Sequence, residues 1–480
     1  MHLHPPDAVR DIARRLEAAG HATYAVGGAV RDVVLGLPAQ DWDLATHARP
    51  AEIRRLFRRT VPIGIEHGTV GVLGGDSVLY EVTTFRRDVE TTGRHAVVEF
   101  ADTIEEDLAR RDFTINALAW DPASERLHDP YGGMADLAAG LLRTVGRPEE
   151  RFAEDYLRVL RALRFAGQFR LAIEPETWSA LVAAVPHLDV LSAERVREEL
   201  LKVLTKSRCA SATLSLYAAT GVLRVLYPPL EALVGLGAGE DEDAWAESLR
   251  AVDAVPPSRP LLRTAALLHA VGMPAARTRD LRGGWRFTGH EQRGARLAED
   301  LLRRLKFSNA EVERIGRLVR HQSDLFPPDA RSPIIRRWLR ALGPDMMYDL
   351  WRLRFALWRA QVGAQPPADL LERWRMVRLV ARERAPLSVG ELAIGGADLK
   401  ALGIQPGPRF GEILRALLER VLEDPRLNER TRLVELAREE LERQEGGAEA
   451  ARTPDHGRGR GQRRGAGPEA PREPPGGEGS

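Results

Sequence analysis

The stretch that decides the fold of this chain is Tyr24-Ala-Val-Gly-Gly-Ala-Val-Arg-Asp32, which is followed after a short link by Asp41-Trp-Asp-Leu-Ala-Thr46. The apolar start, Tyr24–Val26, predicts a buried strand, the glycine pair a turn, and residues 29–36 a helix. A glycine pair before a helix lets backbone N–H groups approach an anion without hindrance from a Cβ atom, and a helix N-terminus favours negative charge. The first half of the stretch therefore predicts a phosphate-binding turn.

The second half carries two aspartates on one face of a predicted strand. Asp41 and Asp43 alternate with apolar residues, so both carboxylates point to the same side. Two carboxylates on a rigid strand suit Mg²⁺, which is usually bound by carboxylates together with substrate phosphates. The phosphate turn and the aspartate strand together predict a phosphoryl or nucleotidyl transferase. A second Asp-x-Asp, at Asp241 and Asp243, lies in an acidic run without apolar alternation and is interpreted as a solvated loop.

Length and composition bound the class of protein. The chain has 480 residues, too many for a single hydrophobic core, and such a length favours roughly three domains. The apolar content of 44% and the charged content of 29% are typical of globular proteins, and the net charge of +1 gives no overall attraction to nucleic acid. The single cysteine, Cys209, excludes an intramolecular disulfide, and no run approaches the ~20 apolar residues of a membrane span. We expect a cytoplasmic protein without membrane association.

Two strands and a polar loop are predicted after the aspartate pair. Thr69–Leu73 and Val78–Phe85 are strand-like and are joined by a glycine turn. Glu81, in the second strand, could join the aspartates in binding metal or form an ion pair with Arg86, and the ion pair is favoured. Residues 86–97 are polar and lack periodicity, which predicts a mobile loop.

A charged helix is predicted over residues 105–116. Its residues Arg110, Arg111 and Asp112 are candidates for neutralising a triphosphate and for holding the site together. The alternative is a helix of surface ion pairs, which is a stronger alternative for Arg110 than for Arg111, because Arg111 adjoins apolar residues.

A second informative helix is predicted over residues 151–169. Asp155, Arg158 and Arg161 recur at intervals of three, and Arg164 continues the row, so they share one side of the helix. A carboxylate that accepts from an exocyclic amine, beside an arginine that donates to a ring nitrogen, would suit both cytosine and adenine. Uracil and guanine present a carbonyl and an N–H there, so both contacts would be mismatched. The alternative, which spacing alone favours, is an ion-pair ladder on a solvent-exposed face.

The C-terminal half is predicted to be helical. His269, His290 and His321 could bind a metal, but Ala270 stands where a hydrolase of this kind needs an aspartate, so a scaffold without hydrolase activity is favoured. Residues 446–480 lack periodicity and predict disorder. Four tryptophans are candidates for the core or for stacking on RNA, of which the core is favoured: Trp338, Trp351, Trp358 and Trp374.

Taken in order, these motifs resemble the class II tRNA nucleotidyltransferases (CCA-adding enzymes) and the related bacterial poly(A) polymerases. The similarity is strongest over residues 20–205, and residues 260–325 resemble the HD-type region that some members carry. The motifs that carry the resemblance are Gly27-Gly28-Ala29-Val30-Arg31-Asp32, Asp41-Trp42-Asp43, Glu81-Val82-Thr83-Thr84-Phe85-Arg86, Arg110-Arg111-Asp112-Phe113-Thr114, Glu154-Asp155-x-x-Arg158 and the helix from Ser192.

The resemblance implies an α+β fold, with a nucleotidyltransferase head built on a small mixed sheet of five strands. An all-helical neck, body and tail would follow. The division we predict is a head over 1–145, a neck with base-reading helices over 146–205, a body with a degenerate HD-like region over 206–330, a tRNA-binding tail over 331–445 and a disordered end over 446–480.

The resemblance also implies the reaction, which is addition of CCA to the 3′ end of tRNA from CTP and ATP by Mg²⁺-dependent two-metal nucleotidyl transfer, without a nucleic-acid template. Its partners would be tRNA, ATP and CTP, with no membrane and no obligate protein partner. The alternatives are a bacterial poly(A) polymerase or an enzyme that adds only CC or only A; a phosphohydrolase and an inactive RNA-binding protein are more distant. The residues implied are Asp41 and Asp43 as catalytic metal ligands, Gly28, Arg31 and Arg111 at the triphosphate, Asp155 and Arg158 as the base template, and Arg161 and Arg164 near the incoming nucleotide.

Overall fold

The structure, a computed structural model, describes residues 3–39, 41–92, 95–237, 243–282, 284–324 and 326–450, with side chains except at 88–98 and 445–450. The predicted acidic loop at Asp241 and the predicted disordered end beyond residue 450 lie outside this part of the chain. The chain forms two compact units, one made of residues 1–328 and 342–375, the other of residues 329–341 and 376–480. The five-part division stays a prediction.

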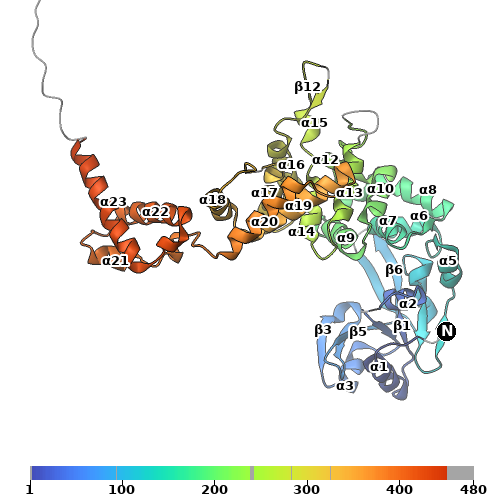
Figure 1. Cartoon of the computed structure of the whole chain (residues 1–480). Coiled ribbons are helices and arrows are strands. Elements are labelled where there is room, and N and C mark those ends of the chain that lie inside the picture. Colours follow the sequence, from blue (N-terminus) through green and yellow to red (C-terminus); the bar gives the residue numbers. More distant parts are fainter. Residues whose placement is uncertain are drawn as a thin grey trace, which may run out of the picture. The chain divides into compact units, whose positions relative to one another are not determined.

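A mixed sheet forms the N-terminal part of the first unit (Figure 1). Strands β2 and β5 pair in parallel, and the other neighbours pair antiparallel. The α+β prediction is confirmed, but the sheet has seven strands and not five. In spatial order the strands are β3 (Thr60–Gly64), β4 (Thr69–Leu73), β5 (Leu79–Thr84), β2 (Asp43–Thr46), β1 (Thr23–Val26), β8 (Ala119–Asp121) and β9 (Arg126–His128).

The two faces of this sheet have different roles. Helices α1 (Asp7–Ala18) and α3 (Pro50–Leu56) contact each other and pack on one face, where Leu44 and Val82 are buried (Figure 1). The apolar residues of α1, including Leu16, are buried against this face. Side chains alternate between the faces of a strand, so the neighbours of these core residues point to the opposite face. That face carries the candidate site.

The predicted loop over residues 86–97 is wrong for its described residues. They belong to a hairpin of β6 (Arg86–Thr92) and β7 (His95–Phe100), paired antiparallel with one register shift. The segment lacks the hydrophobic alternation of a half-buried strand, and it contains several β-branched residues that suit an extended backbone. A strand segment without alternation of apolar and polar residues leaves no periodicity to detect.

The rest of the first unit is mainly helical, with two short strand pairs, β10 (Leu141–Leu142) with β11 (Ala172–Ile173) and β12 (Thr278–Arg279) with β13 (Trp285–Arg286). Within the described residues no helix is long and apolar enough to cross a membrane. The single helix predicted over residues 151–169 is wrong, because it is interrupted at Asp155. The helices are α2 (Gly28–Val34), α4 (Ile104–Ala109), α5 (Gly133–Ala139), α6 (Pro148–Glu154), α7 (Leu157–Phe169), α8 (Pro175–Ala184), α9 (Ala193–Lys206), α10 (Ala210–Thr220), α11 (Val222–Leu226), α12 (Pro228–Glu231), α13 (Ala244–Ala254), α14 (Pro260–Leu268), α15 (Met273–Ala276), α16 (His290–Arg304), α17 (Asn309–His321) and α19 (Pro344–Val362).

The second unit is a smaller helical body with its own apolar core. Ile413, Leu417 and Val421, on one side of α22, are buried together with residues of α21 and α23. Arg336 is also buried, and it donates to the carbonyl oxygen of Leu422 at 2.7 Å. The helices concerned are α21 (Gly396–Ala401), α22 (Pro408–Glu423) and α23 (Arg430–Ala450), while α18 (Ser332–Leu342) and α20 (Ala368–Arg382) cross the boundaries between the units.

Candidate active site

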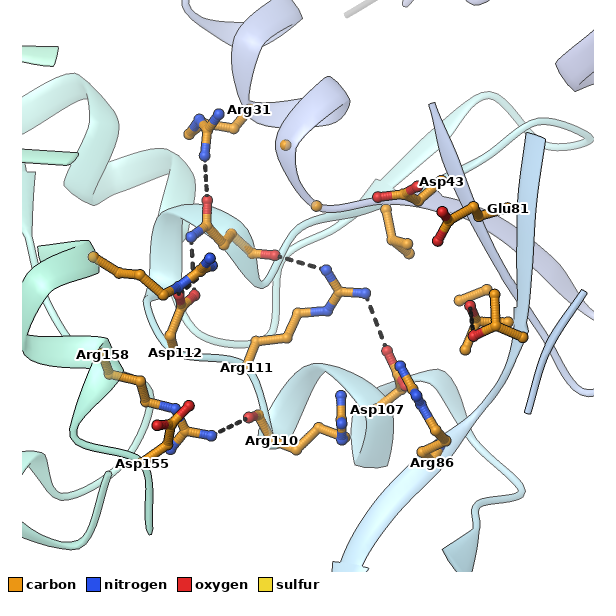
Figure 2. A pocket seen from close by; sticks show the side chains of 18 of the residues that line it. Arg31, Asp43, Glu81, Arg86, Asp107, Arg110, Arg111, Asp112, Asp155 and Arg158 are labelled. Carbon is orange, nitrogen blue, oxygen red and sulfur yellow. Dashed lines mark hydrogen bonds and ion pairs between the residues drawn. The ribbon is translucent and has the colours of Figure 1, made fainter. Parts of the chain in front are cut away.

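Two adjoining cavities open beside the second face of the sheet. The first, of about 580 Å³, is lined by Asp43 and Glu81 and by charged residues that follow α4 and begin α7 (Figure 2). The second, of about 470 Å³, is lined by Asp41 and Arg164. We call them the Glu81 cavity and the Asp41 cavity. They share Gly28, Arg31 and Asp43, so the glycine turn and one aspartate border both.

Asp43 lies next to a second carboxylate on the neighbouring strand. Leu44 of β2 pairs with Val82 of β5, so the preceding residues, Asp43 and Glu81, are also neighbours, and both side chains point into the cavity (Figure 2). Although the Asp43 side chain keeps contact with solvent, desolvation by the surrounding cavity wall raises its pKa to about 6, with further increases from the charges of Glu81 and Asp41 and an opposing effect of Arg111. Unneutralised negative charge gathers here, which a bound cation would relieve.

The predicted alternation in exposure around the aspartates is confirmed, but the strand is shorter than predicted, because β2 begins at Asp43 and Asp41 precedes it. Asp41 and Asp43 are exposed, whereas Trp42 is 4% and Leu44 0% exposed. The predicted ion pair between Glu81 and Arg86 is wrong: among the described residues no hydrogen bond or ion pair joins them, and the Arg86 guanidinium donates to the carbonyl oxygen of His67 at 2.9 Å. Glu81 therefore remains available to the cavity.

Arg111 lies against the glycine turn. Gly27 has φ +74°, and a Cβ atom there would lie 2.8 Å from Nη1 of Arg111. That guanidinium donates to Asp107 at 3.2 Å and to the carbonyl oxygen of Asn116 at 3.3 Å. The helix predicted over 105–116 is wrong beyond Ala109, because α4 ends there, and Arg111 follows it. The turn thus brings a cation to the point where the sequence predicts phosphate.

Asn116 links three charged residues, and sequence reasoning assigned it no role. Its side-chain oxygen accepts from Nη1 of Arg31 at 2.6 Å, and its amide donates to Asp112 at 2.9 Å. Asp112 also accepts from Nε of Arg161 at 2.7 Å. The one sequence signal is an asparagine between apolar neighbours, since a buried amide must find hydrogen-bond partners.

This network fixes the charge states of its members. Burial alone would raise the pKa of Asp112, but the charge of Arg161 and hydrogen bonds from Arg161, Asn116 and a backbone N–H hold it below its ordinary value. Burial lowers the pKa of Arg31, and the adjacent Asp32 opposes this effect. Asp112 therefore stays ionised and joins Asn116 and Arg161 in one network, which holds the site together, as predicted. The guanidiniums of Arg31 and Arg161 stay charged.

Asp155 occupies the break between α6 and α7. Its backbone is extended, and one carboxylate oxygen accepts from the N–H of Leu157 at 3.0 Å, which competes with helix continuation. Its other oxygen lies 2.6 Å from Nη2 of Arg195, on α9. Sequence reasoning missed Arg195, because no local pattern reveals a partner on another helix.

Arg158 lies close to Asp155 in the Glu81 cavity (Figure 2). Its guanidinium donates to Glu154, to the carbonyl oxygen of Arg151 at 2.9 Å and to that of Arg110 at 3.3 Å. A donor held by three acceptors is preorganised for a ligand. Because the helix is broken at Asp155, the predicted single row of side chains is wrong at its first member, but both side chains line the same cavity.

The structure separates the two remaining arginines of this row. Arg161 lines the Glu81 cavity, whereas Arg164 lines the Asp41 cavity, where its Nε donates to Glu199 at 2.7 Å. Its exposed fraction is 6%. Every predicted site residue thus borders one of the two cavities, with Gly28, Arg31 and Asp43 at their junction.

The three histidines of the HD-like region are not gathered. His269 is buried, with Nδ1 2.8 Å from the carbonyl oxygen of Ala266 and Nε2 3.3 Å from Glu247. His290 contacts a backbone carbonyl, and Nδ1 of His321 lies 2.7 Å from Asp324. In the described part of the chain, no three His, Cys, Asp or Glu side chains are placed to hold a metal ion. These contacts favour the scaffold interpretation.

The donor set of the active site nevertheless fits magnesium. Asp41 and Asp43 offer two carboxylates, and Glu81 adds negative charge beside Asp43. Mg²⁺ is commonly held by one or two protein carboxylates, with waters and substrate phosphates as the remaining ligands. A full protein cage is not required.

Three family models match the chain. The one described as "Poly A polymerase head domain" matches residues 23–143. The one described as "Probable RNA and SrmB-binding site of polymerase A" matches residues 170–233. The one described as "tRNA nucleotidyltransferase domain 2 putative" matches residues 284–437. Together they cover both the head and most of the helical region.

Curated relatives and solved structures agree with these models. The CCA-adding enzyme of Lactiplantibacillus plantarum is 33% identical over 436 residues, which cover 90% of this chain and 95% of that protein. The crystal structure of the Bacillus stearothermophilus CCA-adding enzyme in complex with CTP has a TM-score of 0.70 at 30% identity, covering 93% of this chain and all of that one. The Thermotoga maritima CCA-adding enzyme, solved with tRNA, shares the fold with a TM-score of 0.52 at 20% identity, covering 92% and 97%.

Proposed function

Because this chain belongs to the CCA-adding enzyme family, we propose that it extends the 3′ end of tRNA with CCA, using CTP and ATP. The observation that carries this proposal is that one cavity joins Asp43 and Glu81 to Arg111 and to the pair Asp155 and Arg158. Metal-binding, phosphate-binding and base-reading groups thus converge on a volume of about 580 Å³. Such a site fits one nucleotide and the end of one primer.

The transfer step needs charge neutralisation more than covalent chemistry. The 3′-oxygen of the primer attacks the α-phosphorus, the bond to pyrophosphate breaks, and the hydroxyl proton leaves to solvent. Mg²⁺ held by Asp41 and Asp43 would supply the positive charge that acidifies this hydroxyl and stabilises the leaving pyrophosphate. Arg111, beside Gly27, and Arg31 bind the triphosphate and orient it for in-line attack.

Base choice would follow from Asp155 and Arg158. The Asp155 carboxylate accepts from the exocyclic amine of cytosine or adenine, and Arg158 donates to the ring nitrogen. Both side chains are held by other residues before a nucleotide binds, which supports discrimination by fixed geometry. We place the chemistry in residues 1–145, the base-reading helices in 146–205, a helical body with the degenerate HD-like region in 206–330 and the tRNA-binding tail in 331–445.

The test is an incorporation assay with Mg²⁺, a tRNA that ends before CCA, and labelled CTP or ATP supplied separately and together. The proposal predicts C incorporation with CTP alone, and A incorporation that depends on prior addition of C. Absence of both labels would overturn the nucleotidyltransferase assignment. Long A tails on unrelated RNA would replace CCA addition by poly(A) synthesis, and incorporation of only C or only A would indicate a partial enzyme.

A further inference from the structure

A third cavity lies in the helical region of the first unit and shares no lining residue with the two cavities of the active site. It has a volume of about 440 Å³ and lies between residues of α13, α14, α19 and α20, all within the first unit. Its apolar wall includes Leu262, Phe355, Leu371 and Trp374. Nothing in the reaction described above uses it.

The aromatic side chains of this wall are only half-buried. Phe355 and Trp374 retain intermediate exposure, whereas Trp351, packed 5.8 Å from Trp374, is 3% exposed. The rings of Phe355 and Trp374 meet edge to face, with centroids 6.2 Å apart. Trp351 thus belongs to the core, as predicted. Phe355 and Trp374, which also meets Tyr348 edge to face at 5.4 Å, both line the cavity, where a planar ligand could contact them.

The rim of the cavity is rich in positive charge. The single carboxylate of Asp349 is 3.3 Å from Arg259, 2.5 Å from Arg314 and 2.9 Å from Arg352. In the described part of the chain, no other carboxylate pairs with these three guanidiniums. Arg259 and Arg352 also line the cavity, so the positive charge that Asp349 does not neutralise faces the cavity.

Arg359 adds a further cation to the same rim. It lines the cavity, it is exposed, and within the described residues its side chain makes no hydrogen bond or ion pair. Half-buried aromatic rings beside guanidiniums suit a ligand with a flat π-system and a negative charge. A nucleotide has both properties.

We propose that this cavity binds an unstacked nucleotide of the RNA substrate, with its base on Phe355 and Trp374 and its phosphate among Arg259, Arg352 and Arg359. The proposal rests on the proposed function, which supplies RNA as the ligand. A free nucleoside triphosphate fits less well, because no aspartate or glutamate is among the described residues that line the cavity, so none could hold its metal ion. An RNA phosphodiester needs no metal.

The test measures binding and does not require turnover. Dissociation constants of the full chain for a tRNA lacking CCA are measured by fluorescence anisotropy over a range of salt concentrations. Phe355→Leu keeps an apolar side chain but removes the aromatic face, and we expect it to weaken binding about tenfold. Arg359→Gln should reduce the slope of log K against log salt by about one, as expected for one lost phosphate contact. Arg296→Gln, an exposed arginine on α16 without a side-chain partner in the described structure, is the matched control and should change neither quantity.

Unchanged affinity and salt slope in both cavity variants, with thermal melting showing that they are folded, would overturn the proposal. Free ATP could supply the same base and negative charge, and equilibrium dialysis with ATP alone tests this possibility. A second ATP bound per chain, and lost in Phe355→Leu, would contradict an RNA site. Failure of the proposed function can be told apart from failure of this proposal. An inactive protein whose RNA affinity still depends on Phe355 and Arg359 would refute CCA addition and support this cavity.

Discussion

The carboxylate of Asp155 lies 2.6 Å from the Nη2 atom of Arg195, forty positions later in the chain. The ion pair joins the break between α6 and α7 to helix α9, so the proposed base-reading carboxylate is oriented by two elements. One oxygen is committed to Arg195 and the other accepts from a backbone N–H, which leaves the remaining lone pairs for a nucleobase.

Removal of this carboxylate should loosen base choice. We expect Asp155→Ala to lower the preference for CTP and ATP over UTP and GTP by about tenfold or more, because the mismatched contact disappears, while some transfer remains. Arg195→Gln should have a smaller effect in the same direction, since the Leu157 N–H still holds the carboxylate. The measurement is kcat/KM for all four nucleotides. An unchanged ratio in Asp155→Ala would refute the template assignment.

Gly27→Ala should impair nucleotide binding through Arg111. The new Cβ atom would meet Nη1 of Arg111 at 2.8 Å, so the guanidinium must move, and we expect KM for the nucleotide to rise about tenfold. Gly20→Ala is the matched control: Gly20 has φ +86°, but nothing lies within 4 Å of its added Cβ atom. Both variants place a side chain at positive φ, which costs about 1–3 kcal/mol of stability, and the larger cost falls on Gly27→Ala because the ψ of Gly27, −131°, lies outside the left-handed helical region. Equal KM values in the two variants would contradict the proposed phosphate contact.

Loss of Arg161 should destabilise the protein in a pH-dependent manner. The folded-state pKa of Asp112 lies below its ordinary value of 3.8, so its ionised form contributes stability above that pH, and this contribution is lost as the pH falls through the folded-state pKa. Arg161→Gln leaves a buried unpaired carboxylate, which we expect to cost about 3 kcal/mol at neutral pH.

The loss of stability in Arg161→Gln should be smaller near pH ~4.5. Without Arg161, burial raises the pKa of the Asp112 carboxyl, so the protein can fold with this group protonated. Urea unfolding at neutral pH and at the lower pH measures the free energy of unfolding of the parent and of the variant. The double variant Asp112→Asn/Arg161→Gln should recover most of the lost stability at neutral pH. A loss that does not depend on pH, or that persists in the double variant, would show that Asp112 is not the cause.

The HD-like region should have no metal-dependent hydrolase activity. His269, His290 and His321 are each bonded to a different local acceptor, and the position after His269 is Ala270. We expect no hydrolysis of phosphomonoesters or phosphodiesters with Mn²⁺ or Ni²⁺, and CCA addition unchanged in His321→Ala. Hydrolysis that requires these metals and disappears in His269→Gln would contradict the scaffold interpretation.

Local periodicity predicted the elements that have one buried face. The alternation around Asp43 placed both aspartates on one side, and the strands that became β4 and β5 were predicted within a residue or two. The hairpin of β6 and β7 could not be predicted in this way, because it carries no alternation of apolar residues. Strand pairing alone defines it.

Long-range contacts explain the other differences. The helix break at Asp155 depends on a side-chain hydrogen bond to Leu157 and a partner on another helix, neither of which is visible in an i, i+3 pattern. The role of Asn116 depends on Arg31, 85 positions away. Sequence motifs thus indicated which residues form the site, whereas the contacts that orient them required the fold.

The most direct test of the account is single-turnover transfer of CTP to a tRNA lacking CCA, by Asp43→Asn and by Asp11→Asn. Asp11 is an exposed aspartate of α1, and its ion pair among the described residues is local, with Arg14 at 3.1 Å. We predict that Asp43→Asn lowers the rate of transfer by about a hundredfold or more at saturating Mg²⁺, since a catalytic metal contributes several kcal/mol of charge stabilisation, while Asp11→Asn transfers at the parent rate. Transfer by folded Asp43→Asn at a rate close to that of the parent would contradict the assignment of this cavity as the catalytic centre.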